Sequence, residues 1–152
     1  MEIEILTKNF RQTKQVGRAL AREIIREGRG EKAAVIALVG DLGGGKTTFT
    51  QGLAAGLGVK EKVLSPTFVI LKSFNARKNS SPFERLYHID CYRIGKAKDI
   101  AELGFDEIIG KPENIVVVEW ADKIKELLPK TSLFILFEFI DSKTRKIKIM
   151  LK

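Results

Sequence analysis

The stretch Gly40-Asp41-Leu42-Gly43-Gly44-Gly45-Lys46-Thr47 decides the fold of this chain. It matches the pattern G-x-x-x-x-G-K-[ST] at every fixed position, and a second threonine, Thr48, follows it. An unbroken apolar run at residues 33–39 precedes the stretch, and a helical pattern follows it through Leu53. Because this motif requires a buried strand before it and a helix after it, the sequence predicts a phosphate-binding loop.

The residue types of this loop suit the phosphates of ATP or GTP. Glycines let the backbone bend around an anion, so that several N–H groups at the start of a helix point at it. Lys46 is expected to reach the β- and γ-phosphates, Thr47 to bind Mg²⁺ through its hydroxyl, and Thr48 to contact the α-phosphate. The loop residues Gly40, Asp41, Leu42, Gly43, Gly44 and Gly45 are therefore predicted nucleotide contacts. ATP and GTP are not separated by these residues, although the sequence lacks an Asn-Lys-x-Asp pattern of the kind that reads guanine.

Strand and helix patterns continue on both sides of the loop. Residues 2–6 alternate as a strand does, and residues 13–26 carry apolar side chains at helical spacing before Gly28. Residues 115–118 are a short apolar run typical of a buried strand. The other expected elements are strands at 68–74 and 85–89, which we interpret as a hairpin, helices at 97–103 and 121–128, and strands at 133–140 and 146–151.

These patterns predict the fold class. The runs 33–39 and 115–118 are apolar on both faces, as in parallel strands covered by helices. The last two strands are joined by a short polar turn, so they must pair antiparallel. We expect an α/β fold, namely a three-layer P-loop NTPase domain with a mixed, mainly parallel sheet and an antiparallel C-terminal strand pair. The length of 152 residues and the 44% hydrophobic content indicate that residues 1–152 form a single domain.

Charge and apolar content restrict the partners and the location. The 27 basic and 19 acidic residues give a net charge of +8. This excess indicates either contact with nucleic acid or an acidic protein, or simply a lysine-rich solvated surface. The single cysteine, Cys91, fits a reducing compartment. No apolar run approaches the roughly 20 residues of a membrane-spanning helix, and the first residues lack a signal-peptide pattern. We expect a cytoplasmic protein that does not enter the membrane.

Two acidic residues follow strand patterns and are candidates for the catalytic and metal sites. Glu119 directly follows the run 115–118, and Asp90 ends the shorter, more polar stretch 87–90. Because Mg²⁺ in a phosphate-loop site also takes a carboxylate at the end of a neighbouring strand, we assign Glu119 to the metal. Asp90 is then expected to orient the attacking water or to sense the γ-phosphate. The alternative for either acid is to cap a helix or to pair with a lysine.

Three neighbouring features are open between two interpretations. His88 shares a strand face with Asp90, where a structural role is the commoner one. Trp120 either contacts a partner or packs in the interior. The segment Ser65-Pro66-Thr67 is either a switch that responds to the γ-phosphate or an ordinary turn before a strand.

Five separated motifs occur together in a recognisable order and spacing. They are the loop Gly40 to Thr48, Ser65-Pro66-Thr67-Phe68, His88-Ile89-Asp90-Cys91-Tyr92-Arg93, Glu102-Leu103-Gly104-Phe105 and Val118-Glu119-Trp120. This set resembles the TsaE family, also called YjeE, over nearly the whole chain, and it is far more specific than the loop alone. The resemblance implies a bacterial ATPase that works with TsaB and TsaD in the threonylcarbamoyladenosine modification of tRNA.

The resemblance also implies roles for individual residues. Lys46 and Thr47 match the nucleotide and magnesium positions of the family. Glu119 matches a metal-associated acid, and Asp90 matches an acid needed for turnover.

Two further positions and the cofactors follow from the same resemblance. Thr13 and Arg145 resemble positions near the base and sugar of the nucleotide. The implied cofactors are ATP and Mg²⁺, and contact with tRNA is expected to be indirect, through the TsaB–TsaD complex. Cys91 stands where the family often has leucine, and residues 76–82 match loosely, so neither receives a role.

Three functions remain open at this point. The favoured one is an accessory ATPase that is slow alone and faster in complex, because no arginine stands in an obvious finger position beside the phosphate loop. A kinase for a small acceptor is disfavoured, because little length is left for an acceptor-binding lid. The third is a nucleotide-dependent binding module that holds tRNA directly through the +8 charge.

Overall fold

The structure is a computed structural model, and it describes residues 1–41, 43, 45–64, 70–77 and 80–150. Within these residues, every helix and strand expected from the sequence is present, with ends shifted by a few residues. In chain order they are β1 (Glu2–Thr7), α1 (Phe10–Glu27), β2 (Ala34–Gly40), α2 (Lys46–Gly56), β3 (Leu71–Asn75), β4 (Arg85–Asp90), α3 (Ala97–Ala101), α4 (Phe105–Ile109), β5 (Asn114–Glu119), the 3-10 helix η1 (Ala121–Leu127), β6 (Leu133–Phe139) and β7 (Arg145–Met150).

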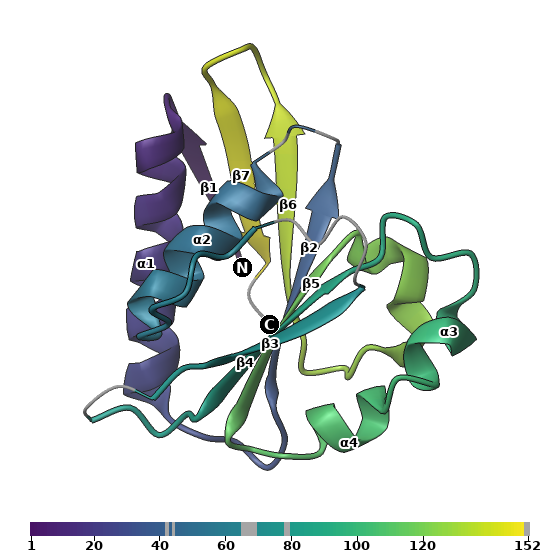
Figure 1. Cartoon of the computed structure of the whole chain (residues 1–152). Coiled ribbons are helices and arrows are strands. Elements are labelled where there is room, and N and C mark those ends of the chain that lie inside the picture. Colours follow the sequence, from purple (N-terminus) through teal and green to yellow (C-terminus); the bar gives the residue numbers. More distant parts are fainter. Residues whose placement is uncertain (42, 44, 65–69, 78–79, 151–152) are drawn as a thin grey trace.

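One seven-stranded sheet runs through the molecule in the order β1-β7-β6-β2-β5-β4-β3 (Figure 1). The central strand β2 pairs in parallel with β5 and β6, and β4 pairs in parallel with β5. The pairs β1–β7, β6–β7 and β3–β4 are antiparallel. Five of the seven described strands therefore point the same way, which confirms the mixed, mainly parallel sheet and the antiparallel C-terminal pair.

Helices cover both faces of this sheet. Helices α1 and α2 lie on one face, and α3, α4 and η1 lie on the other (Figure 1). Alternate residues of the buried strands divide between the two cores, with Ile36 and Leu38 facing α1 and α2, and Val35 and Ala37 facing the other helices. The predicted three layers are confirmed.

Helix α1 packs closely against α2, which follows the phosphate loop. It begins at Phe10 because the side chain of Asn9 accepts a hydrogen bond from the Gln12 N–H at 2.9 Å. A Cβ atom at Gly17 would lie 2.3 Å from the Phe49 carbonyl oxygen, and one at Gly52 would lie 2.0 Å from the Lys14 carbonyl oxygen. Only glycine permits this approach, so α1 holds α2 at a short distance.

Helix α4 was not expected from the sequence. It has five residues, and Gly104 starts it in the left-handed region at φ 83°. Fewer than two turns give no usable helical periodicity, so only its packing of Phe105 and Ile109 into the core reveals it. No helix within the described residues is long and apolar enough to cross a membrane.

Candidate nucleotide site

The glycine-rich loop joins the carboxyl end of β2 to the first turn of α2. Gly40 has a φ of 146°, and a Cβ atom there would lie 2.2 Å from the Phe137 carbonyl oxygen of β6. Gly45 is the N-cap of α2 and has a φ of 100°. A side chain at either position would strain the turn, so the backbone that faces the start of α2 depends on these two glycines.

The ammonium group of Lys46 is buried and held against the loop itself. Its Nζ donates to the carbonyl oxygens of Gly40 and Asp41, each at 2.7 Å, and lies 4.2 Å from the ring centre of Trp120. Burial lowers the pKa of Lys46, while the charge of Glu119 is the largest influence in the opposite direction. Two carbonyl oxygens and an aromatic ring thus satisfy the Lys46 ammonium in the candidate site.

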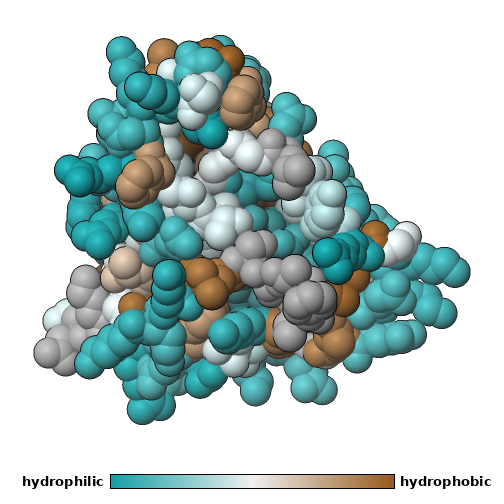
Figure 2. All heavy atoms as spheres, turned by 45° about the horizontal axis from the view of Figure 1, so that its top comes forward, coloured by the Kyte–Doolittle hydropathy of each residue, from teal (hydrophilic) through white to brown (hydrophobic). Residues whose placement is uncertain are grey.

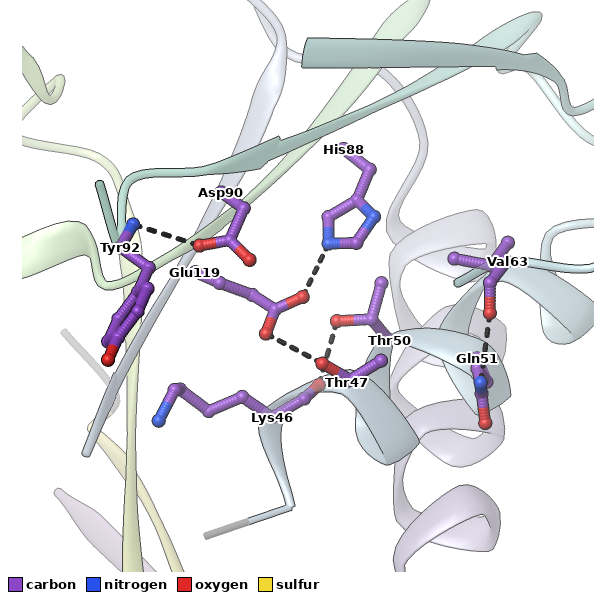
Figure 3. A network of polar contacts seen from close by, with 9 residues as sticks. All are labelled: Lys46, Thr47, Thr50, Gln51, Val63, His88, Asp90, Tyr92 and Glu119. Carbon is purple, nitrogen blue, oxygen red and sulfur yellow. Dashed lines mark hydrogen bonds and ion pairs between the residues drawn. The ribbon is translucent and has the colours of Figure 1, made fainter. Parts of the chain in front are cut away.

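Thr47 and Glu119 are joined directly at this edge of the sheet (Figure 3). The Thr47 hydroxyl donates to Glu119 Oε1 at 3.0 Å, and Glu119 Oε2 lies 2.5 Å from His88 Nε2. Glu119 is 2% exposed and His88 is 0% exposed. Glu119, the predicted metal carboxylate, thus lies next to Thr47, and the buried His88 is hydrogen-bonded to it.

Asp90 lies beside Glu119 on the next strand. The two residues are register partners at the carboxyl ends of β4 and β5, and both side chains lie at the same edge in Figure 3. Asp90 Oδ1 accepts a hydrogen bond from the Tyr92 N–H at 2.9 Å, which fixes the carboxylate in the turn after β4. Burial lowers the pKa of Lys46, and the charge of Asp90 opposes this less than the charges of Glu119 and Asp41 do.

Thr13 and Arg145 come from the two ends of the chain and meet at Gly45. A Cβ atom on that glycine would lie 3.5 Å from Thr13 Cγ2 and 3.7 Å from Arg145 Cγ. The Thr13 hydroxyl is buried and hydrogen-bonded to Thr7 at 2.8 Å. Arg145 Nε donates to the Gly43 carbonyl oxygen at 2.8 Å, so both side chains border the phosphate loop.

Trp120, for which the sequence left open a partner contact or interior packing, contacts Lys46 and Tyr92. Its backbone lies in the left-handed region at φ 57°, which is unusual for a residue other than glycine. The Lys46 ammonium lies over the indole ring, and the Tyr92 ring lies at a centroid distance of 5.2 Å from it. The only sequence signal for this position was its adjacency to Glu119.

The remaining predicted contacts fall in or next to the loop. Thr48 is half-buried in the first turn of α2, and Gly43 has a φ of 78°. Leu42, Gly44 and the segment Ser65-Pro66-Thr67 lie outside the described residues.

These features fit a nucleotide with Mg²⁺. The loop opens at the start of an α-helix, where backbone N–H groups and the helix dipole favour an anion. Mg²⁺ at such sites takes one or two protein oxygens and completes its shell with phosphates and water, and Thr47 and Glu119 offer a hydroxyl and a carboxylate together. The surface seen when the top of Figure 1 is turned forward is mostly hydrophilic, with residues of intermediate hydropathy in its middle (Figure 2).

The sheet order and the loop between β2 and α2 define a P-loop NTPase fold. The family model described as "Threonylcarbamoyl adenosine biosynthesis protein TsaE" matches residues 7–147. The chain therefore belongs to the TsaE family, as the motifs suggested.

Individual relatives agree with this assignment. The tRNA threonylcarbamoyladenosine biosynthesis protein TsaE of Bacillus subtilis is 42% identical over 113 residues, which are 74% of this chain and 66% of that protein. The TsaE protein of Treponema pallidum is 33% identical over 119 residues, covering 78% of this chain and 83% of that protein. The crystal structure of Bacillus subtilis YdiB superposes with a TM-score of 0.74 at 33% identity, covering 98% of this chain and 84% of YdiB.

Proposed function

We propose that this chain is a single-domain cytoplasmic ATPase that binds ATP with Mg²⁺ and supports the TsaB–TsaD complex in the threonylcarbamoyladenosine modification of tRNA. The observation that carries the proposal is the 3.0 Å bond between the Thr47 hydroxyl and the Glu119 carboxylate at the start of a phosphate loop. Membership of the TsaE family supports the pathway. Contact with tRNA is proposed to pass through the complex.

Binding begins at the loop and at Lys46. The phosphates take the N–H groups at the start of α2, and the Lys46 ammonium exchanges the carbonyl oxygens of Gly40 and Asp41 for phosphate oxygens. Thr48 adds a hydroxyl near the α-phosphate. Thr13 and Arg145, which flank Gly45, are proposed to border the base and sugar.

Thr47 and Glu119 would hold the metal. When bound, Mg²⁺ neutralises charge on the β- and γ-phosphates and so favours transfer of the phosphoryl group to water. Thr47 contributes its hydroxyl, and Glu119 contributes Oε1, the oxygen that already faces this hydroxyl. Buried as it is, Glu119 keeps its position without rotating in solvent.

Asp90 is the proposed group for the attacking water. It stands at the same sheet edge as Glu119, and the Tyr92 N–H holds its Oδ1. The Asp90 carboxylate is proposed to accept a hydrogen bond from water and to orient it toward the γ-phosphate. Within the part of the chain that the structure describes, the arginine beside the loop, Arg145, donates to backbone oxygens, so an additional cation from a partner would raise the rate.

Substitution Lys46→Ala tests the central claim. It removes charge-assisted hydrogen bonds worth about 3 kcal/mol, so ATP affinity is expected to fall about 100-fold and phosphate release to be lost with it. Calorimetric titration with ATP and Mg²⁺, together with a thermal melt, measures the effect. The exposed lysine variant Lys60→Ala serves as the control and should bind like the wild type. Equal ATP affinity in Lys46→Ala and the wild type would contradict the proposed nucleotide site.

A further inference from the structure

The imidazole of His88 is buried and forms its hydrogen bond inside the candidate site. The ring lies on β4, is 0% exposed, and has Nε2 2.5 Å from Glu119 Oε2. Because a carboxylate oxygen accepts, we assign the ring proton to Nε2, which is then the donor in this bond. Among the described residues, Nδ1 has no hydrogen-bond partner. The polar contact of this ring is therefore directed at Glu119.

The sheet register explains how the ring reaches the carboxylate. His88 pairs with Val117, two residues before Glu119 on β5, so the two side chains are diagonal neighbours on one face of adjacent parallel strands. The contact uses Oε2 and leaves Oε1 turned toward the Thr47 hydroxyl. Each oxygen of this buried carboxylate thus has its own partner (Figure 3).

We propose that His88 is a positioning residue that fixes the orientation of the Glu119 carboxylate, so that one oxygen faces Thr47 and the metal. The inference rests on the proposed function and adds to it a group outside the phosphate loop. Without a donor at Nε2, Oε2 would be a buried, unpaired acceptor, and the carboxylate would rotate to share Oε1 between competing partners. Outer partners that orient a metal ligand typically contribute about 10- to 100-fold to metal affinity or activity.

Two variants separate the hydrogen bond from the space that the ring fills. His88→Phe keeps a flat ring but removes the donor, whereas His88→Gln places an amide N–H near the position of Nε2. Affinity for ADP is measured by calorimetry with and without Mg²⁺, and phosphate release from ATP is measured at a series of Mg²⁺ concentrations. We expect His88→Phe to bind ADP normally without Mg²⁺ and to need about 10- to 100-fold more Mg²⁺, with His88→Gln recovering most of the loss.

The control variant is Leu86→Val, on the same strand and 0% exposed. It should lower the melting temperature without changing the Mg²⁺ dependence. A wild-type Mg²⁺ dependence in His88→Phe, or an equal defect in His88→Phe and His88→Gln, would overturn the positioning role. If His88→Phe does not fold, His88→Asn takes its place, because its amide is too short to reach Glu119. Failure of the wild type itself to bind ADP or to hydrolyse ATP would instead refute the proposed function.

Discussion

Thr47 and Glu119 lie 72 residues apart in sequence and touch through one hydrogen bond. The bond matters because both groups are oxygen ligands of the kind that Mg²⁺ prefers. Within the described ranges of the chain, neither of the two oxygens in this bond is hydrogen-bonded to the backbone of its own helix or strand. The neighbouring hydroxyl of Thr50 differs, because it donates to the Lys46 carbonyl oxygen at 2.8 Å and so bonds the backbone of its own helix. Two buried or half-buried threonines on α2 therefore have separable roles.

Substitution Thr47→Val should abolish most hydrolysis and weaken nucleotide binding less. Valine keeps the volume but deletes the proposed metal ligand, so the rate should fall by more than the roughly 10- to 100-fold typical of losing an outer partner. Phosphate release at increasing Mg²⁺ measures the effect, with Thr50→Val as the matched control. Our assignment of Thr47 would fail if Thr47→Val, like the control, responded to Mg²⁺ as the wild type does.

Sequence reasoning located the main groups of this site but not their connections. The loop motif identified Lys46 and Thr47, and the strand-end pattern placed Glu119 next to them. The bond between His88 and Glu119 depends on the register of β4 against β5, which apolar patterning does not determine. The packing of Trp120 on Lys46 likewise requires a left-handed backbone turn that no local signal predicted.

At the scale of elements, the position of the phosphate loop depends on two helices in close contact. Gly17 of α1 and Gly52 of α2 let the two backbones approach to distances that exclude a Cβ atom. Helix α2 carries Lys46 and Thr47, and α1 carries Thr13, so this contact holds together the two helices that supply predicted nucleotide contacts.

Substitution Gly52→Ala should therefore destabilise the protein although alanine favours helices. The added Cβ atom would lie 2.0 Å from the Lys14 carbonyl oxygen, and overpacking of this kind typically costs about 1–3 kcal/mol. That exceeds the gain of about 1 kcal/mol in helix propensity. Urea unfolding measures the difference. Gly95→Ala is the control, since nothing lies within 4 Å of a Cβ atom there. Equal stability of Gly52→Ala and the wild type would show that the helices can separate freely.

The order and type of the long elements followed from the sequence, and so did the short helix α3, whereas α4 was missed. The signals are strong in β2 and β5, where apolar residues form a continuous run, and in α1, where apolar residues recur at helical spacing over several turns. Helix α4 was missed because its five residues are too few to show a helical repeat of apolar side chains. The segment η1 is a 3-10 helix interrupted at Ile124, where φ is −125°. The segment Ser65-Pro66-Thr67 lies outside the described residues, so its interpretation as a switch stays a prediction.

On the scale of the whole molecule, the net charge of +8 has two possible uses. It can meet acidic surfaces of partner proteins, or it can hold tRNA directly. Direct phosphate contacts make affinity fall steeply with salt, so filter binding of tRNA over a salt series distinguishes the two. The proposed function favours the first use over the second, because the nucleotide site is expected to work within a protein complex, although a lysine-rich solvated surface would give the same net charge.

The isolated chain should be a slow ATPase that TsaB–TsaD accelerates. A cation supplied by a partner can speed phosphoryl transfer by about 10³- to 10⁵-fold, and Asp90 and Glu119 already stand side by side to use it. Phosphate release is measured for the wild type, Glu119→Gln and Asp90→Asn, alone and with the complex. Both variants should still bind ATP but lose most of the stimulated rate. Turnover of the wild type that is equally fast without partners would contradict activation, and full stimulation of either variant would contradict its assignment.

The meeting of Thr13 and Arg145 at Gly45 has a consequence for how the protein is made. Strand β7 begins at Arg145 and lies between β1 and β6 in the sheet. Until β7 has left the ribosome, a growing chain therefore lacks Arg145 beside the phosphate loop and also lacks the strand with which β1 pairs. A nucleotide that binds only the folded protein stabilises it in proportion to its affinity. ATP would therefore stabilise a chain that includes β7 and leave products truncated before β7 exposed to proteolysis.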